Sequence, residues 1–322
     1  MVTGGAGYIG AHVVRSLLES GRTPLVLDDL STGLAARLPA GVELVQGRVT
    51  DEDLVAAALG GPGVQGVIHL AGKKSPTDSV ADPLHYAREN VGGVVSLLAA
   101  VRRTGCTRVV FSSSCSVYGT PTTPTVDEDA PLDPVSPYGD SKLYGERLLS
   151  SAGHAYGLGA VSLRYFNVVG AAEPALVDTG AHNLVPVAVQ ALLAGRRPQV
   201  YGDDYPTADG TCVRDYVDVR DVAEAHVAAA VALEQAPRVA AYNVGRGEGS
   251  SVLQVLDLLQ EVSGRRSGHV VRPRRPGDPA HVVGRVDRIA AELGWRARRD
   301  LADSVTSAWR AATTRWAGSV AS

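Results

Sequence analysis

The sequence predicts an α/β protein: a Rossmann-type doubly wound parallel sheet with a smaller C-terminal lobe that binds substrate. Three observations predict this fold. A glycine-rich turn, Gly4–Gly10, lies almost at the N-terminus. Short apolar runs then alternate with helical segments as far as about residue 166, a pattern typical of a parallel sheet with crossover helices. The second half of the chain lacks this regularity, which indicates a separate, smaller lobe.

The glycine turn predicts a dinucleotide site. Gly4, Gly7 and Gly10 stand three residues apart. In such a turn the first glycine permits a tight bend, the second lets the backbone approach a pyrophosphate, and the third lets helix and strand pack closely. Apolar residues at 13, 14, 17 and 18 then follow helical spacing, with Gly21 as the C-cap. The phosphates would lie at the N-terminus of this helix, where free N–H groups and the helix dipole favour anions.

An acidic pair indicates which dinucleotide binds. Leu25–Leu27 is a candidate buried strand that ends at Asp28, and Asp29 follows. Asp28 lies 18 residues beyond Gly10, near the separation of about 20 residues that is typical of the acid at the adenosine ribose hydroxyls. Because an acid in this place repels a 2′-phosphate, NAD is favoured over NADP.

The rest of the first half completes the sheet. Further strands are expected at Val42–Gln46, Val67–Leu70, Val109–Phe111 and Val161–Tyr165. Helices are expected between them at Asp51–Leu59, Tyr86–Arg103 and Tyr138–Ala155. Ligands of such sheets bind beyond the carboxyl ends of the strands. Polar segments stand at these ends: Ala71-Gly72-Lys73-Lys74, Ser112-Ser113-Ser114 and Asn167.

The second half indicates how the chain divides. It adds helical patterns at Ala181–Gly195, Val219–Glu234, Val252–Ser263 and Ser304–Arg315, a strand at Ala241–Gly245 and a loop at Pro273–Pro279. We expect an NAD-binding domain of residues 1–166 plus about 217–245. Residues 167–216 and 246–322 would form the smaller lobe over the carboxyl edge of the sheet.

Composition excludes several classes of function. The 322 residues carry a net charge of −3, with 45% hydrophobic and 20% charged side chains, so nucleic acid and membrane surfaces are not expected partners. No apolar run approaches the ~20 residues of a membrane span, and Met1 leads into the glycine turn without a signal peptide. Cys106, Cys115 and Cys212 are isolated, which fits a reducing cytoplasm and neither a disulfide framework nor a metal site.

Tyr138 and Lys142 are candidates for acid–base chemistry. They stand four residues apart after Pro137, which suits a helix start, so both should project from one helix face. A free tyrosine titrates at about pH 10. A nearby lysine cation lowers that pKa, and the phenolate then takes a proton from a substrate hydroxyl. Ser114 is placed to hydrogen-bond the same oxygen. The alternatives are an unrelated surface pair and a serine that caps a turn.

Longer motifs carry a resemblance. Gly4–Gly10, Ser112–Gly119 and Ser136–Lys142 together resemble the extended short-chain dehydrogenase/reductase superfamily. Tyr165–Gly170 and Tyr201–Tyr216 resemble, within it, the UDP-glucose 4-epimerase (UDP-galactose 4-epimerase) family. The Tyr201–Tyr216 stretch is the most specific, and the similarity extends to about Trp309.

The resemblance implies a site for each ligand. It places NAD on the glycine turn, the acidic pair, the ends of the following strands and the Tyr138 region: Gly4, Gly7, Tyr8, Ile9, Gly10, Asp28, Asp29, Arg48, Val49, Leu70, Ala71, Gly72, Lys74, Asn90, Ser112, Tyr138, Lys142 and Phe166. It places a UDP-sugar on Lys74, Ser114, Tyr138, Asn167, Asn183, Leu184, Arg214, Arg275, Asp278 and His281. The arginines make independent sense, because guanidinium groups match diphosphate oxygens bidentately. A solvated basic loop is the alternative for Arg265–Arg275.

Two positions depart from the family pattern. Gly47-Arg48-Val49 stands where the family carries an acid near the adenine. Arg48 has no acceptor for the adenine amino group, so we expect it to stack on the ring instead. His281 stands at the position that borders the sugar, where some members carry tyrosine and others a smaller residue. A histidine of intermediate size leaves the range of accepted sugars open.

The resemblance implies reversible, NAD-dependent C4 epimerisation of UDP-glucose and UDP-galactose through a transient 4-keto sugar, with galactose metabolism as one setting. It also implies a homodimer paired through the helices near Tyr86–Arg103 and Tyr138–Ala155. A 4-epimerase of UDP-N-acetylhexosamine, UDP-glucuronate or a UDP-pentose is the first alternative. A sugar-nucleotide dehydratase is disfavoured, because Cys115-Ser116 replace the Asp-Glu pair of that chemistry. A non-catalytic NAD sensor would not need Tyr138 and Lys142.

Overall fold

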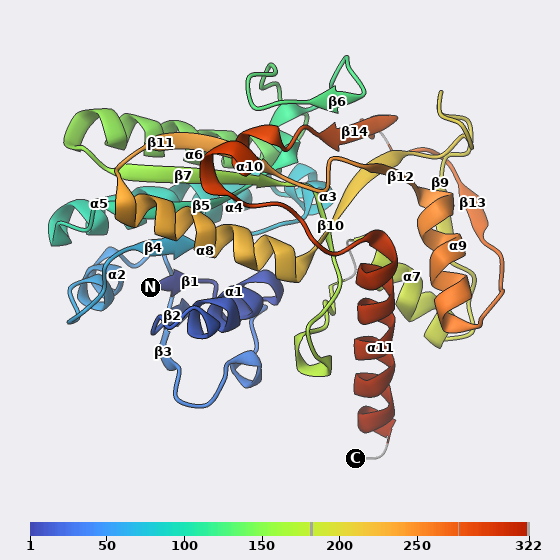
Figure 1. Ribbon diagram of the computed structural model, residues 1–322, viewed down its shortest axis with the longest axis horizontal. Helices are drawn as coiled ribbons and strands as arrows, with labels where there is room; N and C mark the ends of the chain where they lie inside the picture. The colour runs from blue at the N-terminus through green and yellow to red at the C-terminus, as the bar shows by residue number, and fades with distance from the viewer. Residues whose placement is uncertain (181–182, 276, 321–322) are drawn as a thin grey trace.

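A seven-stranded parallel sheet forms the larger lobe (Figure 1). The computed structural model describes residues 1–180, 183–275 and 277–320. The strand order is β11-β7-β5-β4-β1-β2-β3, so the order runs outward from β1 in both directions and places the glycine turn at a topological switch point. The strands are β1 (Val2–Thr3), β2 (Leu25–Asp28), β3 (Glu43–Gln46), β4 (Val67–His69), β5 (Arg108–Ser114), β7 (Gly159–Tyr165) and β11 (Val239–Val244). The Rossmann-type fold is thereby confirmed.

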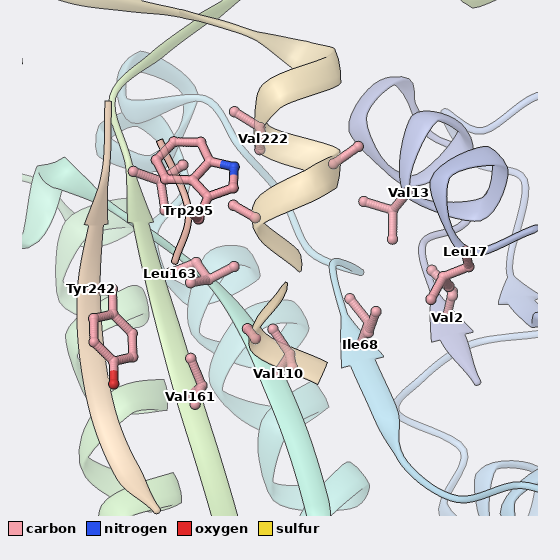
Figure 2. Close-up of a cluster of buried hydrophobic side chains, with 14 of the residues drawn as sticks. Val2, Val13, Leu17, Ile68, Val110, Val161, Leu163, Val222, Tyr242 and Trp295 are labelled. Carbon is pink, nitrogen blue, oxygen red and sulfur yellow. The ribbon is translucent and has the colours of Figure 1, made fainter. Parts of the chain in front are cut away.

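Helices cover both faces of this sheet. One face carries α1 (Tyr8–Glu19) and α8 (Val219–Gln235), and the other carries α2 (Glu52–Leu59), α5 (Gly92–Thr104) and α6 (Pro137–Tyr156). Figure 2 shows the core on the first face, where Val13 and Leu17 of α1 gather with Val2 and Ile68 of the strands. The helical spacing of the apolar residues in α1 is what aims them at the sheet.

The start of α6 matters most for the site. Ser136 is its N-cap and accepts a hydrogen bond from the N–H of Gly139 (3.2 Å). Pro137 occupies the first helical turn, where its missing N–H costs nothing. The expected helix start is therefore met, and Tyr138 and Lys142 both lie buried in α6.

The smaller lobe packs beyond the carboxyl ends of the main strands (Figure 1). A mixed sheet runs β12 (Gly249–Ser251), β10 (Val213–Asp218), β14 (His281–Gly284) and β6 (Thr125–Val126), with β8 (Asn167–Val169) also paired to β10. A second pair joins β9 (Gln199–Tyr201) to β13 (Val270–Arg272). Three helices complete a separate core: α7 (Leu184–Leu193), α9 (Val252–Ser263) and α11 (Leu301–Val320). Within the described residues, no helix combines the length and apolar character needed to cross a membrane.

Three local differences from the sequence predictions have physical causes. The expected helix Tyr86–Arg103 is broken: α4 (Pro83–Tyr86) runs into a π-helical turn (Ala87–Val91) before α5 begins. A π turn inserts a residue and often marks a functional position, and this one carries Asn90. The C-cap of α1 is Ser20, and Gly21 follows it at φ +77°. The expected helix Ala181–Gly195 begins at Leu184 as α7, and Ala181 lies outside the described residues.

Candidate active site

The three glycines of the turn have different structural roles. Gly4 has φ +70°, and a Cβ placed on it would lie 2.7 Å from the backbone nitrogen of Ala71. A Cβ on Gly10 would lie 2.1 Å from the carbonyl oxygen of Gly4. A Cβ on Gly7, the N-cap of α1, would meet only that same oxygen, at 3.2 Å. Gly4 and Gly10 thus permit close packing, while Gly7 leaves open the space before the helix N-terminus, which fits a pyrophosphate.

The first turn of α1 is tied to the smaller lobe. Tyr8 is buried, and its hydroxyl donates to the carbonyl oxygen of Gly170 at 2.6 Å. Ile9 packs on the core between α1 and the sheet. The structure therefore uses the hydroxyl of Tyr8 to join the two lobes beside the glycine turn.

Asp28 hydrogen-bonds the backbone of the glycine turn. Its Oδ2 accepts the N–H of Ala6 (2.9 Å) and its Oδ1 accepts that of Leu30 (2.9 Å). Burial raises the pKa of Asp28. A carboxylate has about four acceptor positions, so Asp28 retains capacity for ribose hydroxyls. Asp29, less buried, accepts the N–H of Ser31 (2.9 Å).

Arg48 already has a protein partner. Its guanidinium forms an ion pair with Glu89, while its Nε donates to Thr50 Oγ1 at 3.4 Å. No signal in the sequence pointed to Glu89, which belongs to the π turn. Val49 is buried in the core beside Gly93. Stacking of Arg48 on adenine stays a prediction, and it would have to compete with this ion pair.

Asn90 organises the loop after β4, which contains Leu70, Ala71 and Gly72. Its Oδ1 accepts the N–H of Lys73 (2.7 Å), and its Nδ2 donates to the carbonyl of Lys73 (3.0 Å) and to Ser141 Oγ (2.9 Å). Both amide hydrogens thus bind protein acceptors. Asn90 would therefore support a cofactor mainly by fixing the loop after β4 to α6. Lys74 follows this loop, with Nζ half-exposed and 3.6 Å from Asp178.

Tyr138, Lys142 and Ser114 converge at the carboxyl end of β5. Lys142 Nζ donates to the carbonyl of Ser112 (2.8 Å) and lies 5.8 Å from the centre of the Tyr138 ring. Ser114 accepts the N–H of Ser116 (3.2 Å) and acts on the Tyr138 hydroxyl, whose pKa it lowers. Ser114 and Tyr138 are both buried.

The electrostatics of this trio correct one expectation. Burial raises the pKa of Tyr138 well above its usual value, and the Ser114 hydrogen bond only partly opposes that rise. Burial also lowers the pKa of Lys142 to about 8. The pKa of Tyr138 is thus raised, not lowered as expected, because removal from water is the largest effect on it.

Ser112 also needs correction. Its side chain is fully buried, and its Oγ lies 2.8 Å from Nε2 of His226 on α8, on the face away from α6. A side chain enclosed in this way does not contact a cofactor. Alternation along β5 explains the outcome, since successive side chains point to opposite faces. What Ser112 offers the site is its carbonyl oxygen, the acceptor for Lys142.

Charged and amide groups gather on the smaller lobe. Arg214 of β10 forms an ion pair with Asp278 (2.5 Å between Nη2 and Oδ1) and is mostly buried. Arg275 lies over the ring of Tyr201, 4.0 Å from its centre. Asn183 is the N-cap of α7, which begins at Leu184, and its amide donates to Asp178 at 3.3 Å. Asn167 pairs with Tyr216 in the β8–β10 ladder. Arg214 is thus paired with Asp278, three residues beyond Arg275.

His281 stands at the start of β14, and its contact with a sugar stays a prediction. Its ring lies near Gly249, together with Val283, and its Nδ1 is 2.7 Å from the carbonyl of Pro124. The opposite face of β14 meets Phe166: a Cβ on Gly284 would lie 2.5 Å from that ring, and Val282 packs in the same cluster with Phe166 and Cys115. Val282 therefore lies on the face of β14 that packs against Phe166, and His281 lies on the opposite face.

The chain belongs to the NAD dependent epimerase/dehydratase family, whose model matches residues 1–245. It is 45% identical over 312 residues to the UDP-glucose 4-epimerase of Azospirillum brasilense, across 95% of this chain and 89% of that protein. It resembles the solved structure of UDP-glucose-4-epimerase from Stenotrophomonas maltophila with bound NAD and formylated UDP-arabinopyranose, with a TM-score of 0.94, 37% identity, and coverage of 100% and 98%. The UDP-glucose 4-epimerase from Bifidobacterium longum in complex with NAD+ and UDP gives a TM-score of 0.90 and 34% identity over 98% of each chain.

Proposed function

We propose that the protein is an NAD-dependent UDP-glucose 4-epimerase, which interconverts UDP-glucose and UDP-galactose through a 4-keto sugar. The observation that carries this proposal is the buried Tyr138–Ser114 contact at the carboxyl end of β5, with Lys142 behind it. The relatives with NAD and UDP ligands support the same reading. No acid–base pair stands beside Ser114, where Cys115 and Ser116 follow, so a dehydratase is not supported.

Each side chain has a task in this reaction. The glycine turn and Asp28 would hold NAD, which would supply the hydride acceptor and donor for C4. Tyr138 takes the proton of the 4-hydroxyl and gives it back, with Ser114 holding the same oxygen. Lys142, together with the charge of NAD when bound, would supply the positive charge that lets the buried Tyr138 act as a phenolate despite its raised pKa. Arg214 and Arg275 hold the diphosphate while the keto sugar turns to present its other face.

The assignment of ligands to the lobes is part of the proposal. We infer that residues 1–166 with about 217–245 bind NAD and that 167–216 with 246–322 bind the UDP-sugar. Two segments are exceptions: β6 (Thr125–Val126) pairs with β14 of the smaller lobe, and α10 (Asp287–Leu293), followed by Trp295, packs in the core of the larger lobe. Apart from Ser112, the cofactor residues named from the sequence lie in the glycine turn and α1, at or after the ends of β2 to β4, in the π turn, in α6 and after β7.

The test is direct. Purified protein with NAD bound should convert UDP-galactose to UDP-glucose without an added oxidant, and Tyr138→Phe should abolish turnover while NAD stays bound. A wild-type protein that holds NAD and forms no UDP-glucose would overturn the proposal. Unchanged turnover in Tyr138→Phe would remove Tyr138 from its role.

A second candidate function is 4-epimerisation of UDP-N-acetylhexosamines. Val282 favours it, because a small side chain beside Phe166 leaves more room near the sugar than an aromatic one. A panel of UDP-sugars, including UDP-glucuronate and UDP-pentoses, compares these substrates by kcat/KM. Failure of the N-acetyl sugars would restrict the enzyme to hexoses.

We also infer a homodimer in the cytoplasm, with galactose metabolism as the setting. Apolar side chains are exposed on adjoining helices of one face: Val80 of α3 (Pro76–Ala81), Leu84 of α4, Val95 of α5 and Tyr144 of α6. Contiguous exposed apolar patches of this kind mark interfaces. The described cysteines are free, which suits a reducing compartment. Sedimentation should give a dimer, and Val95→Glu should give a monomer.

A further inference from the structure

A buried ion pair stands directly behind Tyr138 and Lys142. Glu146 follows Lys142 by one turn of α6, and Arg164 reaches it from β7. Nη2 of Arg164 donates to Oε2 at 2.6 Å and Nε donates to Oε1 at 3.0 Å. Ser113 Oγ, from β5, donates to Oε1 as well. The side chains of Arg164 and Glu146 are only 5% and 9% exposed.

Neighbouring groups also hydrogen-bond the part of Arg164 that does not contact Glu146. The remaining arm of Arg164, Nη1, donates to the Tyr118 hydroxyl and to the carbonyl of Glu128, both at 3.1 Å. A buried carboxylate is costly unless it is paired and hydrogen-bonded. Glu146 receives a bidentate guanidinium and a hydroxyl, so it is held as a carboxylate in one orientation.

Few other groups stabilise the positive charge of Lys142. Its Nζ is buried, donates to the carbonyl of Ser112 and lies 5.2 Å from the centre of the Phe111 ring. Burial lowers the pKa of Lys142 to about 8, and the charge of Glu146 opposes that fall. His69 of β4 is also near Lys142, and burial, together with the charge of Lys142, lowers the pKa of His69 to about 3, so it is neutral. Tyr138, on α6 itself, is neutral too, since its pKa is raised by burial.

We propose that Glu146 is a positioning residue of the active site, which acts through Lys142: its carboxylate, fixed by Arg164 and Ser113, keeps Lys142 charged beside Tyr138. The inference rests on the proposed function, because it adds a member to the same site. Tyr138, Lys142 and Glu146 stand at successive four-residue steps and share one face of α6. Glu146 touches neither the hydroxyl of Tyr138 nor a ligand position, and its effect is exerted on the protonation of Lys142.

The chain offers an unusually clean test, because it contains only three lysines, Lys73, Lys74 and Lys142. Full-length protein is prepared with lysine labelled with ¹³C at Cε, and the Cε shifts are followed against pH by NMR. Lys142→Met identifies the Lys142 signal. We expect a midpoint of about 8 in the wild type and a midpoint lower by about one unit, tenfold in proton affinity, in Glu146→Gln. Asp140→Asn is the matched control, since it removes an exposed carboxylate from the same helix and should leave the midpoint unchanged.

A second variant controls for misfolding caused by an unpaired, buried Arg164. Glu146→Gln leaves Arg164 buried without its partner, whereas Glu146→Gln combined with Arg164→Met removes both charges, a change that proteins often tolerate. We expect the midpoint of Lys142 to fall in the double variant too, but by less, because loss of the Arg164 cation offsets part of the loss of Glu146. Epimerase assays on the same samples separate the two claims. An unchanged midpoint in an active protein overturns the role of Glu146, and a lowered midpoint in a protein whose wild type is inactive supports that role while overturning the proposed function.

Discussion

Two alanine substitutions in the glycine turn should have opposite consequences. In Gly10→Ala the new Cβ would lie 2.1 Å from the carbonyl oxygen of Gly4 and 2.8 Å from the Cα of Gly5. Both contacts are with backbone, which has no flexible end to move. We expect a loss of stability of about 3 kcal/mol or more, at the upper end for overpacked sites. In Gly7→Ala the new Cβ meets only the oxygen of Gly4 at 3.2 Å, so we expect a loss of about 1 kcal/mol or less, as at an N-cap.

For NAD binding, we expect Gly7→Ala to be the more harmful of the two substitutions. The methyl group of Gly7→Ala occupies the space through which a pyrophosphate reaches the N-terminus of α1, and we expect NAD affinity to fall about 100-fold, or ~2.7 kcal/mol. Thermal unfolding with and without NAD, together with the NAD content of the purified proteins, measures both effects. Without NAD, Gly7→Ala should melt close to the wild type, and at the same NAD concentration it should gain much less stability than the wild type. Retention of NAD by Gly7→Ala, or a wild-type melting temperature for Gly10→Ala, would refute the division of roles.

Three further predictions concern pH, charge and size. Burial lowers the pKa of His226 to about 4, so the unfolded chain binds more protons between about pH 6.5 and 4 and stability falls as the pH falls through that window. His226→Gln should remove about 1.4 kcal/mol per pH unit from that slope in urea unfolding, and an unaltered slope would contradict the buried neutral ring. Arg214→Lys should fold normally but bind UDP at least about tenfold more weakly by calorimetry, since an ammonium lacks the bidentate fork; equal affinity would exclude Arg214 from the diphosphate. Val282→Tyr should spare UDP-galactose turnover and lower kcat/KM for UDP-N-acetylgalactosamine at least about tenfold, and an unchanged ratio would remove Val282 from the sugar pocket.

The central sheet was predictable because its signals are local. Each of its strands is a short apolar run, and the glycine turn fixes where the chain leaves β1 for α1. The pair of Tyr138 and Lys142 was predictable for the same reason, since four-residue spacing places both on one face of a helix. The start of α6 was predictable as well, because its signals, Ser136 and Pro137, are adjacent in sequence.

The smaller lobe and the details of the site depend on contacts that are distant in sequence. β10 and β14 pair through Val213 and His281, and no short window shows that register. Without it the choice between His281 and Val282 as the residue beside Phe166 could not be made. The burial of Ser112 against His226, the Arg48–Glu89 ion pair and the π turn at Asn90 likewise require the packed structure. Burial also reversed the expected direction of the pKa of Tyr138, because sequence spacing gives the neighbouring charge but not the loss of water.

The most direct test of the proposed reaction follows the hydrogen at C4. UDP-galactose carrying deuterium at C4 is incubated with the NAD-bound protein in ordinary water, and the UDP-glucose formed is examined by NMR. A hydride that leaves C4 and returns within one site keeps the label, so we expect deuterium at C4 of the product and none in the solvent. Product with hydrogen from water at C4 would contradict an epimerisation by transient oxidation.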